Sequence, residues 1–160
     1  MPIFIERGVE VEKENLLKTG FYGVIGLLGG SLGQLFGGFD TLFWALLTCS
    51  IIDYFSGGAV AIIFKNSPKT ETGGAKSRIG FKGLVKKIFI YMLVVVAVQM
   101  DIVLKANGFI RNAVIIGFMA NEILSIIENV GLMGINLPKP FVDAVDILKK
   151  KSEEGDINAK

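Results

Sequence analysis

Residues 41–64, TLFWALLTCSIIDYFSGGAVAIIF, decide the fold, because this stretch of 24 residues contains one charged side chain, Asp53. As an α-helix it would be about 36 Å long, which is enough to cross the hydrocarbon core of a bilayer. Its apolar residues are nearly continuous, whereas a helix with one solvated face would carry a regular polar stripe. The stretch is therefore predicted to be a transmembrane helix.

Three further apolar stretches accompany it. Residues 19–39 carry no charge, and residues 88–104 and 113–135 contain only a few polar side chains. Together with a mean hydropathy of +0.56, they predict an all-α integral membrane protein with four transmembrane helices in one membrane domain, residues 1–160. Three spans are the alternative, because glycine is only weakly apolar and the glycine-rich residues 19–39 could lie at the membrane interface.

The polar segments set the expected orientation. Residues 65–87 form a predicted loop with seven basic residues and one acid, and strongly basic loops stay in the cytoplasm. With four spans, the polar lead (residues 1–18) and the C-terminal segment (residues 136–160) are cytoplasmic as well. That segment is predicted to hold a short amphipathic helix over residues 141–148 and a charged tail. Four basic side chains are expected to reach the membrane interface: Arg78, Lys82, Lys86 and Lys87.

A row of glycines runs along the first apolar stretch. The spacing alternates between three and four residues, which places these glycines on one narrow helical face: Gly23, Gly26, Gly30, Gly33 and Gly37. Helices associate in lipid through close backbone contact, which small residues permit. This glycine seam is expected to pack either against another copy of the chain or against a helix of the same chain.

Ionisable groups inside apolar stretches are costly and need partners. Asp53 is expected either to be functional or to be a hydrogen-bonded carboxyl packed against a neighbouring helix. Asp101 is an intramembrane polar residue near the outer end of its stretch, where it could reach water. Residues at spacings of three and four form a predicted polar stripe in the last stretch, facing other helices, a cavity or a pore: Asn121, Glu122, Ser125, Glu128 and Asn129.

Several classes of function are excluded or disfavoured. The chain has no histidine and a single cysteine, Cys49, so an intrachain disulfide, a Cys/His metal site and a His-based triad are excluded. No nucleophile with an adjacent base accompanies the carboxylates, so we expect no enzyme, cofactor or metal. A net charge of +2 is too small to indicate nucleic-acid binding.

Two segments resemble a known family. Residues 77–87, SRIGFKGLVKK, and residues 120–129, ANEILSIIEN, are similar to the toxin-secretion/phage-lysis holin family, as are Asp53-Tyr54 and Asp101. The resemblance covers roughly residues 40–151. Its most specific part is the Asn-Glu-x-x-Ser-x-x-Glu-Asn segment, because intramembrane polar groups are rarely placed by chance.

The resemblance implies a multi-pass protein of the bacterial cytoplasmic membrane that assembles with itself and permeabilises the bilayer. An endolysin or an exported toxin would be its functional, not necessarily physical, partner. Two other functions remain open. One is a small oligomeric ion channel or transporter subunit that uses Asp53 and Glu122. The other is a membrane scaffold whose basic loop and tail recruit a soluble partner or anionic lipid.

Overall fold

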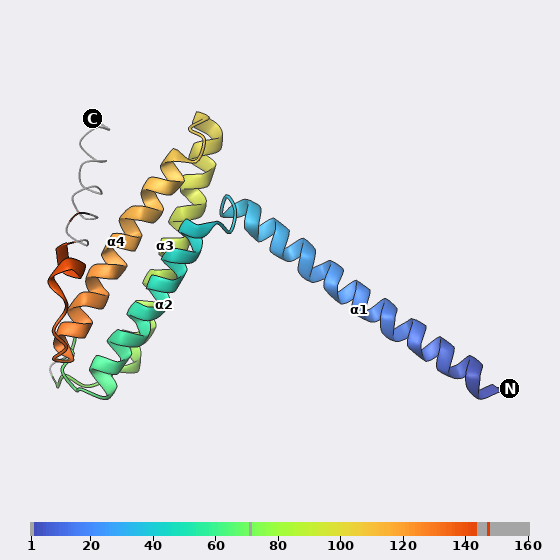
Figure 1. Ribbon diagram of the computed structural model, residues 1–160, viewed down its shortest axis with the longest axis horizontal. Helices are drawn as coiled ribbons and strands as arrows, with labels where there is room; N and C mark the ends of the chain where they lie inside the picture. Colours follow the sequence, from blue (N-terminus) through green and yellow to red (C-terminus); the bar gives the residue numbers. More distant parts are fainter. Residues whose placement is uncertain (1, 71, 144–146, 148–160) are drawn as a thin grey trace. The chain divides into compact units, whose positions relative to one another are not determined.

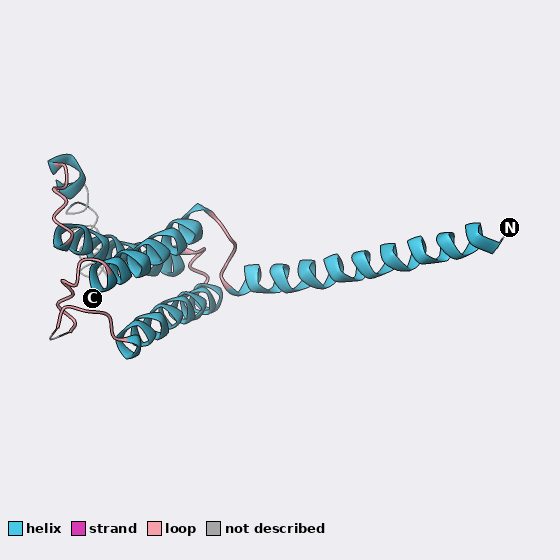
Figure 2. Cartoon of the chain, turned by 90° about the horizontal axis from the view of Figure 1, so that it is seen from below, coloured by secondary structure: helices cyan, strands magenta, loops and turns pink. Residues whose placement is uncertain are grey.

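A computed structural model of the chain describes residues 2–70, 72–143 and 147, and its regular structure within these ranges is entirely helical (Figures 1 and 2). The elements are α1 (Pro2–Leu35), α2 (Thr41–Ile62), α3 (Ser77–Leu104) and α4 (Phe109–Leu132). The all-α prediction is confirmed. The chain divides into two compact units, residues 1–38 and residues 39–160.

The first unit is the helix α1 and the turn that ends it. The helix continues from the polar lead into the glycine-rich stretch and stops because Gly37 and Gly38 adopt positive φ angles of 70° and 103°. The Gly38 N–H donates to the Gly33 carbonyl at 2.7 Å, a bond that closes helices with a left-handed glycine. The predicted seam is therefore shorter than expected, because Gly37 belongs to this turn and not to the helix.

Three helices of the described chain are long and apolar enough to cross a membrane, namely α2, α3 and α4. The helix α1 is not among them, since six glycines lower the hydropathy of its apolar half. Three spans are thus consistent with the structure, and a fourth is not shown. A fourth span through residues 19–39 stays a prediction.

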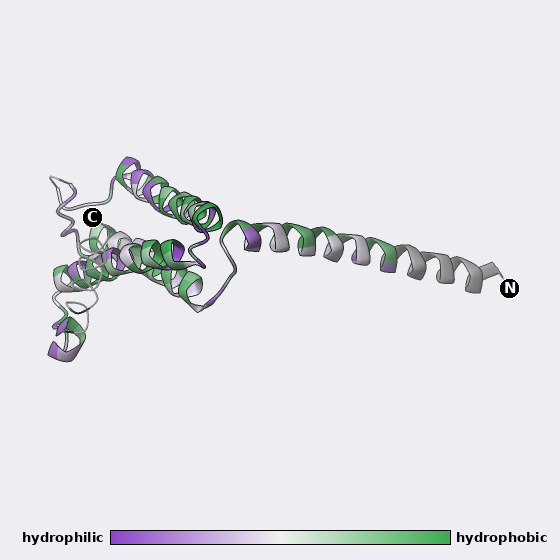
Figure 3. Cartoon of the chain, turned by 90° about the horizontal axis from the view of Figure 1, so that it is seen from above, coloured by the Kyte–Doolittle hydropathy of each residue, from purple (hydrophilic) through white to green (hydrophobic). Residues whose placement is uncertain are grey.

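The second unit is a bundle in which α4 packs against both α2 and α3, while α2 and α3 touch each other much less. Its buried apolar core is small and contains Phe43, Leu46, Val60, Val94, Ala97, Val98, Ile115 and Ala120. Many other large apolar side chains point outward, and Figure 3 shows apolar residues over much of these helices. An outward apolar surface of this kind suits lipid and not water.

Short polar contacts set the ends of the bundle helices. Asp40 begins α2 by accepting a hydrogen bond from the Phe43 N–H at 3.0 Å, which satisfies a free donor of the first turn. Lys105, Asn107 and Gly108 have positive φ angles, so the chain reverses within four residues between α3 and α4. Two neighbouring antiparallel helices result.

The basic segment 65–87 is a loop only as far as Lys76, because residues 77–87 form the first three turns of α3. Gly80 and Gly83 favour turns in this segment, but a helix tolerates single glycines at about 1 kcal/mol each. The remaining loop is closed by the Ser67 N–H, which donates to the Gly73 carbonyl at 3.0 Å. Of the predicted amphipathic helix, residues 141–143 and 147 are helical, and the other residues and the charged tail lie outside the described residues.

Candidate functional site

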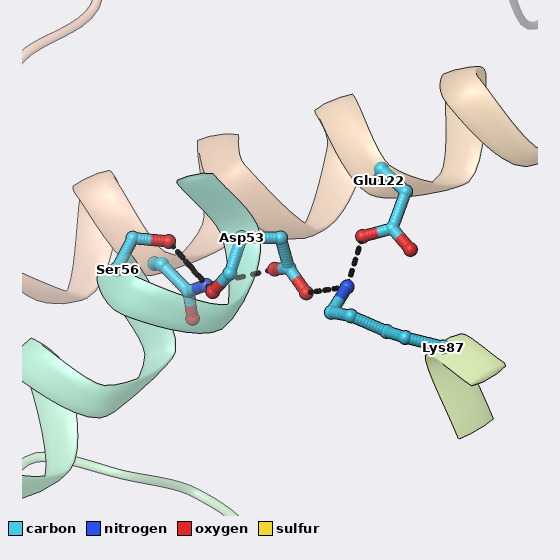
Figure 4. A network of polar contacts seen from close by, with 5 residues as sticks. Asp53, Ser56, Lys87 and Glu122 are labelled. Atoms are coloured by element: carbon cyan, nitrogen blue, oxygen red, sulfur yellow. Dashed lines mark hydrogen bonds and ion pairs between the residues drawn. The ribbon is translucent and has the colours of Figure 1, made fainter. Parts of the chain in front are cut away.

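Three charged side chains meet inside the bundle, one from each helix. The Lys87 ammonium group on α3 lies 2.8 Å from a carboxylate oxygen of Asp53 on α2 and also contacts the carboxylate of Glu122 on α4 (Figure 4). Their side chains are 14%, 16% and 5% exposed, respectively. Asp53 lies about 18 Å along α2 from its start and about 14 Å from its end, so the group is near the middle of that helix.

An amide and a hydroxyl extend this charge cluster. The Asn129 side-chain N–H donates to the second carboxylate oxygen of Asp53 at 3.1 Å and to the Ser56 hydroxyl at 2.9 Å. Asp53 therefore accepts hydrogen bonds through both oxygens, from Lys87 and Asn129. Ser125 also interacts with the Asp53 carboxylate. Gly57 faces the same amide: a Cβ there would lie 3.5 Å from the Asn129 nitrogen, an ordinary van der Waals contact.

Helical periodicity explains which polar residues join the cluster. Glu122, Ser125 and Asn129 are spaced by three and four residues, so they face the same direction from α4. Asn121 and Glu128 precede members of that row by one residue, which turns them about 100° away, and both are exposed. The predicted stripe of five thus splits into an inner row of three and an outer pair.

Lys87 was predicted to reach the membrane interface, but its side chain does not extend toward it. Two intramembrane carboxylates offer its ammonium group a closer partner, so the side chain points into the bundle. The other three predicted interface residues, Arg78, Lys82 and Lys86, are exposed on the first turns of α3. They share one helical face because they are spaced by four residues.

A second set of polar contacts lies at the end of the bundle where α3 connects to α4 and where α2 begins. The Arg111 guanidinium donates to both carboxylate oxygens of Asp40, at 2.7 and 3.0 Å. Asp101 is 7% exposed and accepts from the backbone N–H groups of Ile110 and Arg111 at 3.0 and 2.8 Å. Asp101 does not reach water, because its carboxylate is buried and satisfies the free donors at the start of α4.

Sequence reasoning did not single out Arg111 and Asp40. The sequence carries a signal for this pair, because Asp40 and Arg111 each lie just before a predicted span, residues 41–64 and 113–135. In a four-span chain both positions fall on the same side of the membrane. The hydrogen bond from Arg111 holds the pKa of Asp40 below its ordinary value of 3.8, with further contributions from the Phe43 N–H and from the Arg111 charge. Burial of Asp40 opposes this shift.

The fold and the charge cluster together define a small helical membrane protein with a polar interior. The chain belongs to the bacteriophage holin family, whose sequence model matches residues 30–150. That range contains all three candidate spans and the whole charge cluster. The family and the helices identify a holin-type membrane protein.

Individual relatives match most of the length of this chain. An uncharacterised protein of Listeria monocytogenes is 36% identical over 133 residues, which cover 83% of this chain and 89% of the relative. An uncharacterised protein of Bacillus subtilis is 33% identical over 78% of this chain and 83% of its own length. A probable holin of Bacillus phage phi105 is 28% identical over 68% of this chain and 75% of its own length. No solved structure matches the chain.

Proposed function

We propose that the chain acts as a holin. It assembles with copies of itself in the bacterial cytoplasmic membrane and permeabilises that membrane, so that an endolysin reaches the cell wall or a toxin leaves the cell. The observation that carries this proposal is the family match over residues 30–150, together with the probable phage holin among the relatives. We expect no catalytic activity.

The basic residues support one orientation. The connection between α2 and α3 and the start of α3 carry seven basic residues, which favours the cytoplasmic side for that end of the bundle. The Arg111 end then faces outward. If α1 forms the fourth span, both termini are cytoplasmic. An impermeant thiol reagent applied to intact cells should label Asn107→Cys and not Lys69→Cys, both in a Cys49→Ser background; the reverse pattern would contradict this orientation.

Assembly has two candidate surfaces. The first is the glycine seam of α1, now Gly23, Gly26, Gly30 and Gly33. The second is the outer pair of α4, Asn121 and Glu128, because polar side chains facing lipid are unfavourable and a second copy would cover them. The inner row of α4 is less suited to lining a lesion, since Glu122 and Asn129 bind partners within the bundle.

Co-expression with an endolysin that lacks a signal peptide tests the function. We expect lysis only when both proteins are present, and no lysis of such cells would refute the holin proposal.

Replacing Asn121 and Glu128 together with leucine should change the time of lysis. Gln99→Leu, which removes an exposed polar side chain from α3, is the matched control and should keep the wild-type timing. If wild type, the double variant and Gln99→Leu all lyse at the same time, the outer pair is not an assembly surface.

The charge cluster favours one alternative, a small ion channel or transporter subunit. Acidic and basic groups inside a membrane bundle are common in ion and proton pathways. Such a protein would conduct selectively without killing the cell. A graded, ion-selective current in planar bilayers, without release of protein-sized cargo, would favour the channel over the holin.

A further inference from the structure

The charge cluster contains an unequal number of positive and negative groups. Asp53 and Glu122 share the single ammonium group of Lys87, so the cluster carries a net charge of −1 when all three groups are ionised. An uncompensated charge in a low-dielectric interior is so unfavourable that such groups usually become neutral. We propose that the Asp53–Lys87–Glu122 cluster is a binding site for one proton.

The hydrogen bonds of the cluster leave a place for one proton. Both carboxylate oxygens of Asp53 accept hydrogen bonds, from Lys87 and Asn129, and an ionised carboxylate is the form that accepts through both oxygens. Glu122 accepts from Lys87 through one oxygen, so its other oxygen can carry the proton. Glu122 is also the more deeply buried of the two carboxyls, at 5% against 16% exposed.

A proton suits this site better than a metal cation does. Alkali and alkaline-earth ions need several oxygen ligands, whereas a proton needs one. The Asp53 oxygens are engaged by Lys87 and Asn129. The described residues contain no group of three or more acidic, histidine or cysteine side chains placed to hold a metal ion.

The other groups around the cluster do not supply the missing positive charge. Tyr91 on α3 and Cys49 on α2 lie near Glu122, and neither side chain can become a cation. Lys69 in the loop acts on Asp53 from a distance, but its side chain is exposed to water, which screens its charge. The remaining facing groups, Ser56, Ser125 and Asn129, are neutral.

Infrared spectroscopy of the full chain in lipid vesicles tests the proposal without reference to lysis. A protonated carboxyl has a C=O band that a carboxylate lacks, and charge counting predicts its area at pH 7 for each variant. Wild type should show the band of one carboxyl. Glu122→Gln and Asp53→Asn should both lose it, because each leaves one carboxylate paired with Lys87. Lys87→Met should double it, since two carboxyls then lack a cation.

Controls make each outcome decisive. Asp143→Asn removes a water-exposed carboxyl and should leave the band unchanged. Circular dichroism checks that each variant keeps its helices, and if Lys87→Met does not fold, the two carboxyl variants still decide. The proposal fails if wild type shows no band, or if the band survives in either Glu122→Gln or Asp53→Asn. A wild-type band that appears only when sodium and potassium are removed would also overturn it, in favour of an alkali-metal site. Lysis timing has no bearing on these outcomes, so the proton site and the holin function can fail separately.

Discussion

The Lys87 ammonium group lies 2.8 Å from the Asp53 carboxylate, although the helices that carry the two residues, α3 and α2, pack little against each other. Both helices pack mainly on α4, and Glu122 of α4 contacts the same ammonium group. The ion pair therefore joins two helices that have few other contacts. Its loss should separate them more readily than the loss of a pair between well-packed helices.

Removal of the Lys87 charge should destabilise the bundle. We expect Lys87→Met to lower the free energy of unfolding in detergent by roughly 2 kcal/mol, because two buried carboxyls lose their hydrogen-bond donor. Lys86→Met is the matched control: the neighbouring side chain is exposed, so its replacement should change stability by less than about 0.5 kcal/mol. Denaturant titration followed by circular dichroism measures both, and equal losses would show that the buried pairing is unimportant.

The Asp40–Arg111 pair predicts a dependence on pH. Because Arg111 lowers the pKa of folded Asp40 below 3.8, the stabilisation is complete above that value and is lost as the pH falls through the folded pKa. Asp40 is about half exposed, so the effect should be small. The difference in melting temperature between wild type and Asp40→Asn should be constant from pH 5 to 7 and shrink below pH 4. A difference that grows in acid would contradict the pairing.

The loop between α2 and α3 depends on one glycine. Gly73 has a φ of 68°, and a Cβ there would lie 2.0 Å from the Lys65 carbonyl oxygen, so Gly73→Ala should cost more than about 1 kcal/mol. Gly74→Ala is the control, since its Cβ would meet nothing closer than the Thr72 hydroxyl at 3.7 Å. Thermal unfolding of both variants checks this expectation, and equal melting temperatures would show that the loop can rearrange.

The glycine seam predicts an effect of side-chain size on assembly. If copies of α1 meet through it, Gly30→Leu should abolish the higher bands in a cross-linking ladder from membranes, because leucine holds the backbones apart. Gly58→Leu, at a position on α2 where a Cβ meets nothing within 4 Å, should keep the ladder. An unchanged ladder in Gly30→Leu would exclude the seam as the contact between copies.

The helical architecture was predictable because transmembrane segments can be recognised from their length and hydropathy alone. The span of α2 was predicted to within two residues, since Asp40 at its start and the polar residues after it mark both ends. The start of α3 was not, because Gly80 and Gly83 are typical of turns in water but are tolerated in a helix. Whether α1 spans the membrane could not be predicted, because its many glycines give residues 19–35 a hydropathy close to the lower limit for a transmembrane helix.

The site was predictable only where one helix carries it. The spacing of Glu122, Ser125 and Asn129 placed them on one face from sequence. Their partners lie on other helices: Lys87 is 35 residues from Glu122 in the sequence, and Asp53 is 76 residues from Asn129. No local sequence pattern encodes pairings over such separations. For the same reason, the roles of Asp101 and Arg111 needed the structure: each depends on how two helices meet.

The most direct test of the holin assignment follows induced cells over time with a potential-sensitive dye and a cytoplasmic reporter enzyme about the size of an endolysin. The proposal predicts a delay, then an abrupt loss of membrane potential together with release of the reporter into the medium once the cell wall is digested by added lysozyme. Loss of potential that is gradual and leaves the reporter inside the membrane would contradict a holin and indicate an ion channel.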